Sequence, residues 1–173
     1  LEAHTALVAQ LSARDIHRQY DASINGSMIA GGTVEAALDR HPVDRVRRAV
    51  VEEGKPAVTH YRVRERYRIH TRIECVLETG RTHQIRVHMA HIRHPLVGDP
   101  LYGGAVRLPK AASLETIAAL RSFRRQALHA ERIELEHPIH GTALEVRAPT
   151  PDDMVALAYA LRQDRLEHPD VDF

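Results

Sequence analysis

The chain has 173 residues, of which 43% are hydrophobic and 27% charged, with a formal net charge of +1. This composition excludes a disordered tail and supplies enough apolar side chains for the core of one domain. A single cysteine, Cys75, excludes an internal disulfide, and the sequence lacks the run of about 18 apolar residues that would cross a membrane. We therefore expect a reduced, cytoplasmic protein.

The charge is unevenly distributed along the chain. Residues 40–86 hold 12 Lys or Arg against 6 Asp or Glu, a net of +6, whereas residues 131–173 hold 4 against 10, a net of −6. Phosphate contacts need locally concentrated cations rather than a high overall charge. A basic middle and an acidic end predict one nucleic-acid face and one back face, although ordinary surface patchiness would give the same numbers.

The N-terminal third combines a helix, a strand and a basic loop. Residues 1–13 have apolar positions at helical spacing and predict an amphipathic helix. Residues 16–24 predict a strand that turns at Gly31 and Gly32. Residues 33–55 are irregular and arginine-rich, which is typical of a loop or a loose hairpin.

The middle of the chain predicts two paired strands followed by a helix. Residues 61–69 alternate apolar side chains with arginines, and a turn near His70 would pair them with residues 71–78. After Gly80, apolar residues recur at helical spacing at Ile85, Met89 and Ile92, so Arg81 and Arg86 fall at the start of a helix. Helix N-termini favour anions, and arginine adds a fixed planar charge.

The C-terminal third predicts a flexible loop over residues 103–112, a short helix over 114–123 and a hairpin that turns at 137–142. A last helix follows, with Thr150 as its cap and with Met154, Leu157 and Leu161 facing inward. Hairpins with interspersed helices, without repeated strand-helix-strand units, predict an α+β fold with a mixed, mostly antiparallel sheet and flanking helices.

Four histidines near the middle helix raise the question of a metal site. His88, His91 and His94 are spaced three residues apart, with His83 just before them and only Asp99 nearby as a carboxylate. Metal sites usually add cysteine or carboxylate ligands and a defined second shell. We therefore predict no metal, and expect these histidines to form local hydrogen bonds or to face a nucleic acid.

Segments 17–22, 31–34, 40–42, 54–61, 77–103 and 126–130 together resemble, in the expected order, the pseudouridine synthases that modify large-subunit ribosomal RNA. The family's catalytic aspartate lies in a His-Arg-Leu-Asp motif, which is not found in these 173 residues. The resemblance thus implies that residues 1–173 are the C-terminal part of a single catalytic domain. The nucleophile and any N-terminal RNA-binding domain would lie upstream, and the chain alone would be inactive.

The resemblance also implies an activity: isomerisation of specific uridines to pseudouridine in 23S ribosomal RNA, by a monomer and without a cofactor. Arg86 matches the arginine that pairs with the catalytic aspartate, and Tyr20 matches the tyrosine that stacks on the target uracil. Asp99 matches a structural position. Possible RNA contacts are Arg81, Arg45, Arg47, Arg48, Lys55 and Leu96, although packing explains Leu96 equally well.

Two other interpretations stay open. The chain could be a non-catalytic RNA-binding module of the same fold, although Arg86 and Tyr20, both tied to catalysis, favour the enzyme. A metal-dependent hydrolase built on the histidines is disfavoured for the reasons above.

Overall fold

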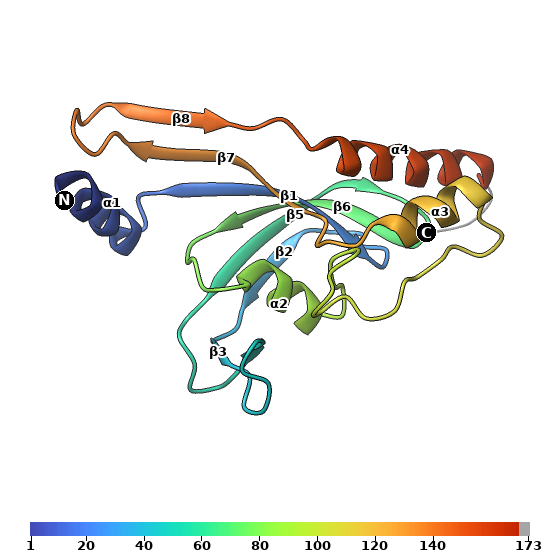
Figure 1. Ribbon diagram of the computed structural model, residues 1–173, viewed down its shortest axis with the longest axis horizontal. Helices are drawn as coiled ribbons and strands as arrows, with labels where there is room; N and C mark the ends of the chain where they lie inside the picture. Colours follow the sequence, from blue (N-terminus) through green and yellow to red (C-terminus); the bar gives the residue numbers. More distant parts are fainter. Residues whose placement is uncertain (170–173) are drawn as a thin grey trace.

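A six-stranded sheet organises residues 1–169, the part of the chain that the computed structural model describes (Figure 1). Its strand order is β2-β5-β6-β1-β7-β8, and every pairing within it is antiparallel. The strands are β1 (His17–Asn25), β2 (Gly32–Glu35), β5 (Val58–Arg66), β6 (His70–Leu77), β7 (Leu128–Glu136) and β8 (Ala143–Arg147). The predicted α+β fold class is confirmed.

The basic segment that the sequence left as a loop or loose hairpin contains a second, two-stranded sheet. It pairs β3 (Leu38–Arg40) with β4 (Arg48–Val50). This hairpin projects below the main sheet in Figure 1, on the same side as α2. The arginine-rich segment therefore has a defined backbone.

In the described part of the chain, four helices flank the sheet. They are α1 (Glu2–Ala13), α2 (Gln84–His91), α3 (Leu114–Ser122) and α4 (Asp152–Glu167). Among residues 1–169, no helix is long and apolar enough to span a membrane.

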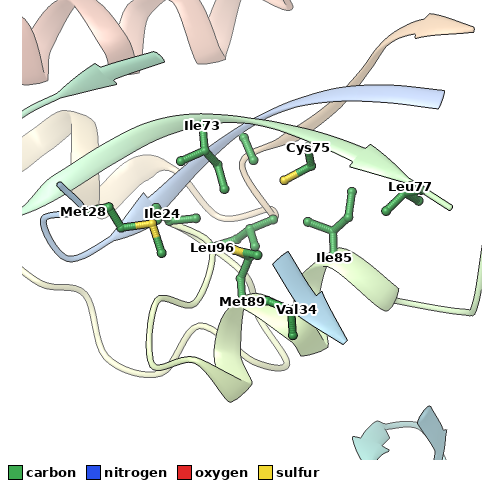
Figure 2. Packing of buried hydrophobic residues seen from close by; sticks show 10 residues of the cluster. Ile24, Met28, Val34, Ile73, Cys75, Leu77, Ile85, Met89 and Leu96 are labelled. Carbon is green, nitrogen blue, oxygen red and sulfur yellow. The ribbon is translucent and has the colours of Figure 1, made fainter. Parts of the chain in front are cut away.

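The main core lies between the sheet and α2. Ile73 and Cys75 are fully buried, and Leu77 is nearly so, as the alternation along β6 predicts. Ile85 and Met89 on α2 pack against them (Figure 2). The alternating residues of β6 and the helically spaced residues of α2 form one cluster, and their packing holds α2 against the sheet.

A second core joins α4 to α3. Met154, Leu157 and Leu161 are at most 3% exposed, which confirms the predicted inward face. The predicted cap, however, is wrong. The N-cap residue is Pro151, and no side chain caps the helix. Because α4 begins one residue later than predicted, Thr150 lies outside the position from which a hydroxyl reaches the first free N–H groups.

The opposite face of the central strands carries ions instead of apolar side chains. Asp21 is fully buried and accepts hydrogen bonds from Arg72 Nε at 2.9 Å and Arg72 Nη2 at 2.7 Å. Arg64 lies 3.3 Å from the same carboxylate and also contacts Glu74 and Glu131, each at 2.7 Å. Asp21 alternates along β1 with the core residue Ala22, so the two side chains point to opposite faces.

Helix α1 is confirmed, but it buries no residue. Its side-chain link to the sheet is Gln10, whose amide donates to the carbonyl oxygen of Glu136 at 2.9 Å and accepts from the Glu136 N–H at 3.0 Å. Gln10 thus occupies one backbone position of β7 as a neighbouring strand would.

Candidate functional site

The turn between β6 and α2 is held by one buried glutamine. The amide oxygen of Gln84 accepts from Thr79 Oγ1 at 2.8 Å and from the Arg81 N–H at 3.0 Å, and its amide nitrogen donates to the Val58 carbonyl at 3.0 Å. Helix α2 begins at Gln84, so Arg81 lies in the turn and Arg86 in the first turn of the helix. The two arginines are therefore anchored differently.

Arg86 is buried, with 8% of its surface exposed, and it makes a two-point ion pair. Its Nε lies 2.7 Å from Asp99 Oδ2 and its Nη2 lies 2.8 Å from Asp99 Oδ1. Asp99 also accepts the backbone N–H groups of Leu101 at 2.9 Å and Tyr102 at 3.1 Å. With four hydrogen bonds, the Asp99 carboxylate is fully engaged, as a structural residue would be.

This pairing fixes the charge of both groups. Desolvation alone would raise the pKa of Asp99, but the hydrogen bonds from Arg86 and from the two backbone N–H groups hold it below its usual range. The hydrogen bond with Asp99 raises the pKa of Arg86. Within residues 1–169 no hydrogen bond involves Nη1 of Arg86, so this nitrogen is free to bind a second anion.

Tyr102 extends the site from Arg86 towards β4. The Arg86 guanidinium carbon lies 5.0 Å from the centroid of the Tyr102 ring. The Tyr102 hydroxyl lies 2.9 Å from His83 Nδ1 and accepts the backbone N–H of Arg48 at 2.9 Å. Burial, with a further contribution from Arg86, lowers the pKa of His83. Tyr102 was not predicted as a site residue, because nothing in its spacing indicates these contacts.

Three of the predicted RNA contacts come together beside this cluster. Arg48, Lys55 and Arg81 line a polar pocket of about 230 Å³, which we call the basic pocket; its other lining residues are Leu38, Asp39, Gly80 and Thr82. Arg81 is oriented by a 3.0 Å hydrogen bond from its Nε to the carbonyl of Pro56. The pocket therefore concentrates positive charge between β4 and the turn before α2.

The other predicted RNA contacts lie elsewhere. Arg45 and Arg47 are exposed in the turn between β3 and β4, where Arg47 pairs with Asp44 at 3.2 Å, and neither lines the basic pocket. Leu96 is fully buried in the main core, where its backbone bridges to Ile24. The packing interpretation accounts for Leu96, and a direct contact with RNA does not fit its burial.

Tyr20 lies on β1, between Cys75 of β6 and Ala130 of β7, and packs half-buried against the main core. It lines a small pocket of about 190 Å³ with Arg18. A Cβ atom on Gly80 would collide with the Arg18 guanidinium, so Gly80 admits Arg18 rather than an outside ligand. Arg18 thus connects the surroundings of Tyr20 with the basic pocket, a role that we did not predict.

Local hydrogen bonds hold three of the four histidines, as predicted. His88 lies 2.8 Å from both Thr59 Oγ1 and the Ala36 carbonyl oxygen, and His94 lies 2.9 Å from the Asn25 carbonyl oxygen. His83 contacts Tyr102 as described. These contacts give the three histidines structural roles.

Comparison with known proteins points to one family. The family model described as RNA pseudouridylate synthase matches residues 1–91. A protein of Xanthomonas campestris pv. campestris named ribosomal large subunit pseudouridine synthase D is 60% identical over 95% of this chain and 50% of its own length. The protein of the same name from Escherichia coli K12 is 57% identical over 97% of this chain and 52% of its own length. The chain thus spans about half the length of these relatives.

Solved structures share the fold. Human RNA Pseudouridylate Synthase Domain Containing 4 superposes with a TM-score of 0.69 at 23% identity, covering 91% of this chain and 67% of that chain. Human RNA Pseudouridylate Synthase Domain Containing 1 gives 0.69 at 24% identity, covering 90% and 63%. At these identities the likeness concerns the arrangement of helices and strands.

Proposed function

Because the chain belongs to the RNA pseudouridylate synthase family, we propose that it forms the C-terminal part of a catalytic domain that isomerises uridines in 23S ribosomal RNA. The observation that carries the proposal is the 60% identity over 95% of the chain to a synthase of this name. We place the reaction in the cytoplasm, with a monomeric protein, ribosomal RNA as the partner and no cofactor.

Arg86 is suited to hold an anionic group at the reaction centre. Asp99 fixes two of its nitrogens, so the guanidinium is oriented before any substrate binds. Its third nitrogen, Nη1, can then pair with a second carboxylate, the attacking aspartate that the family resemblance implies. Pairing with a fixed arginine keeps such a carboxylate ionised in a water-poor site.

Tyr20 and helix α2, which carries Arg86, both contact the main core. Tyr20 packs against the cluster to which Ile85, the neighbour of Arg86, belongs. We assign Tyr20 to stacking on the extruded uracil, because a flat ring on a rigid strand offers a base a surface without sequence preference. We assign the basic pocket to the phosphates beside that nucleotide.

The reaction breaks the bond between C1′ and N1, turns the uracil, and forms a bond between C1′ and C5. The proton on C5 is lost and N1 gains one, so no electron donor or acceptor is needed. None of the residues assigned here supplies the attacking carboxylate: Asp99 and Asp21 are both engaged by arginines. Since the family resemblance places the attacking aspartate in a His-Arg-Leu-Asp motif that these 173 residues lack, we propose that the nucleophile comes from sequence outside them.

Release of tritium from C5-labelled uridine in unmodified 23S RNA tests the proposal. The 173-residue chain should release none, and a protein extended to the length of the relatives should release it. In the extended protein, Arg86→Gln should abolish release, whereas Arg81→Gln should mainly raise KM. Arg147→Gln, at an exposed position of β8 that lines neither the basic pocket nor the Tyr20 pocket, is the matched control and should leave both parameters unchanged.

Two results would overturn parts of the proposal. Release by the 173-residue chain itself would mean that one of its own aspartates attacks. Absence of release from the extended protein, with RNA binding retained, would favour the alternative, a non-catalytic RNA-binding module of the same fold.

A further inference from the structure

A second cleft lies next to the Arg86 site, between residues 97–107 and the end of α3. Its volume is about 470 Å³. Asn25 and Val97 line it from below the surface, since both are at most 4% exposed. Three arginines also line it: Arg107, Arg121 and Arg124.

Among residues 1–169, the three arginines have no counter-charge. Each is exposed, and within residues 1–169 none of their side chains makes a hydrogen bond or an ion pair. The neighbouring Arg125, by contrast, pairs with Asp153 at 2.7 Å. Asp99 is the one carboxylate among the described residues that line the cleft, and Arg86 neutralises it. The cleft therefore presents a concentrated positive field.

The wall of the cleft is rigid. Gly98 has a φ of +72°, and a Cβ atom there would lie 2.6 Å from the carbonyl oxygen of Phe123, so the two backbones are in direct contact. Asp99 follows at once and is held by Arg86 and by two backbone N–H groups. Asp99 thus belongs both to the cleft wall and to the Arg86 site, while Arg86 itself does not line the cleft.

We propose that this cleft binds the sugar-phosphate backbone of the RNA strand that flanks the nucleotide held at Arg86. Three free guanidinium groups can grip phosphate oxygens in two-point fashion. A strand is the expected ligand because the cleft adjoins the Arg86 site through the shared Asp99 turn. The inference rests on the proposed function and adds a second phosphate-binding surface, separate from the basic pocket.

The test compares two triple variants of the 173-residue chain that lose the same charge. The cleft variant combines Arg107→Gln, Arg121→Gln and Arg124→Gln. The control combines Arg14→Gln, Arg62→Gln and Arg147→Gln, exposed arginines that each pair with a glutamate away from the cleft. Binding of a fluorescent uridine-containing RNA stem-loop is measured by anisotropy over a range of salt concentrations, and thermal unfolding checks the fold of each variant.

In the cleft variant, the magnitude of the slope of log K against log salt should fall by about 2 to 3, since each of the three lost phosphate contacts removes roughly 0.7 to 0.9. Affinity at low salt should fall at least tenfold, while the control triple variant changes little. Replacing the same cleft arginines by lysine should keep the salt slope but weaken binding, because lysine lacks the planar fork. If the glutamine variant unfolds, the loss of affinity in the lysine variant still tests the proposal.

Failure of the inference can be told apart from failure of the proposed function. Wild-type binding with a slope that the cleft variants leave unchanged would overturn the cleft alone. Inorganic phosphate at the same molar concentration as the RNA should not displace the RNA from the wild type. If it does, the cleft holds a small anion and the inference about the cleft is overturned. No wild-type binding of RNA at low salt would overturn both.

Discussion

Asp21 and Asp99, two buried aspartates on opposite sides of the six-stranded sheet, both pair with arginines, but the surroundings of the two pairs differ. Asp21 and Asp99 both have fully buried side chains. The partners of Asp21, Arg64 and Arg72, lie in a network with Glu74 and Glu131, and their side chains stay 22% and 25% exposed. The side chain of Arg86, the partner of Asp99, is only 9% exposed and keeps Nη1 unbonded within residues 1–169. Burial of an ion pair is thus a weak sign of function, and an unused donor beside a cleft is a stronger one.

The largest effect should come from removing the charge of Asp99. Asp99→Asn leaves Arg86 buried without a counter-charge, so the free energy of unfolding should fall by about 3–5 kcal/mol in urea titration. The control Asp44→Asn removes an exposed pair and should cost less than about 0.5 kcal/mol. An Asp99→Asn variant of full stability, inactive in the extended protein, would instead assign Asp99 to the chemistry.

Asp21→Asn should cost less, although its carboxylate is equally buried. Arg64 keeps Glu74 and Glu131 as partners, and both arginines stay partly exposed to water, so we expect a loss of about 2 kcal/mol in the same titration. The affinity for RNA should stay unchanged, because the network lies on the face opposite α2. If Asp21→Asn lowers the affinity for RNA and leaves stability unchanged, the assignment of Asp21 to a purely stabilising network is wrong.

Acid should weaken both faces in the same pH range. Hydrogen bonding to Arg64 lowers the pKa of Glu131, and the pKa of Asp99 is also lowered, as described. A carboxyl with a depressed folded-state pKa stabilises above its unfolded pKa and loses that contribution as pH falls through the folded value. The free energy of unfolding should therefore fall from pH 5 to pH 3, and by less in Asp99→Asn. A pH-independent stability would contradict both pairings.

The smallest effect should come from Tyr102→Phe. The change keeps the ring beside Arg86 and removes only the hydroxyl that contacts His83 and the Arg48 N–H, so stability should fall by about 1 kcal/mol. Because the hydroxyl ties β4 to α2, hydrogen exchange of the Arg48 amide should quicken. Exchange of the Thr59 amide, in β5 of the main sheet, is the internal control and should not change.

The sequence predicted the region around β6 and α2 well. Two strong periodicities adjoin there, a period of two ending at Leu77 and a helical period from Ile85 to Ile92, and each predicts its own buried face. The hairpin turn at 137–142 was equally clear from its composition. The start of α4 was wrong by one residue, because Thr150 and Pro151 are both acceptable at a helix start and only the backbone decides between them.

The candidate site was predicted in its residues but not in its contacts. Arg86 was identified, yet its partner Asp99 is reached through a loop, where no periodicity governs which side chains meet. The basic pocket unites Arg48 of β4 with Lys55 and with Arg81 of the turn before α2. Each was predicted as an RNA contact, but nothing in the sequence predicts that the three meet in one pocket. Contacts across loops depend on backbone geometry that composition does not encode.

Cys75, which is buried in the main core, can report on opening of the sheet without an added probe. Burial raises the pKa of its thiol to about 12, and its exposed fraction is zero. Since only the thiolate reacts with alkylating reagents, the native molecule should be inert to them. Labelling of the Cys75 sulfur then requires the central strands to separate, so the labelling rate measures how often the sheet opens. A ligand that clamps the two sides of the sheet would lengthen the labelling time without any engineered probe.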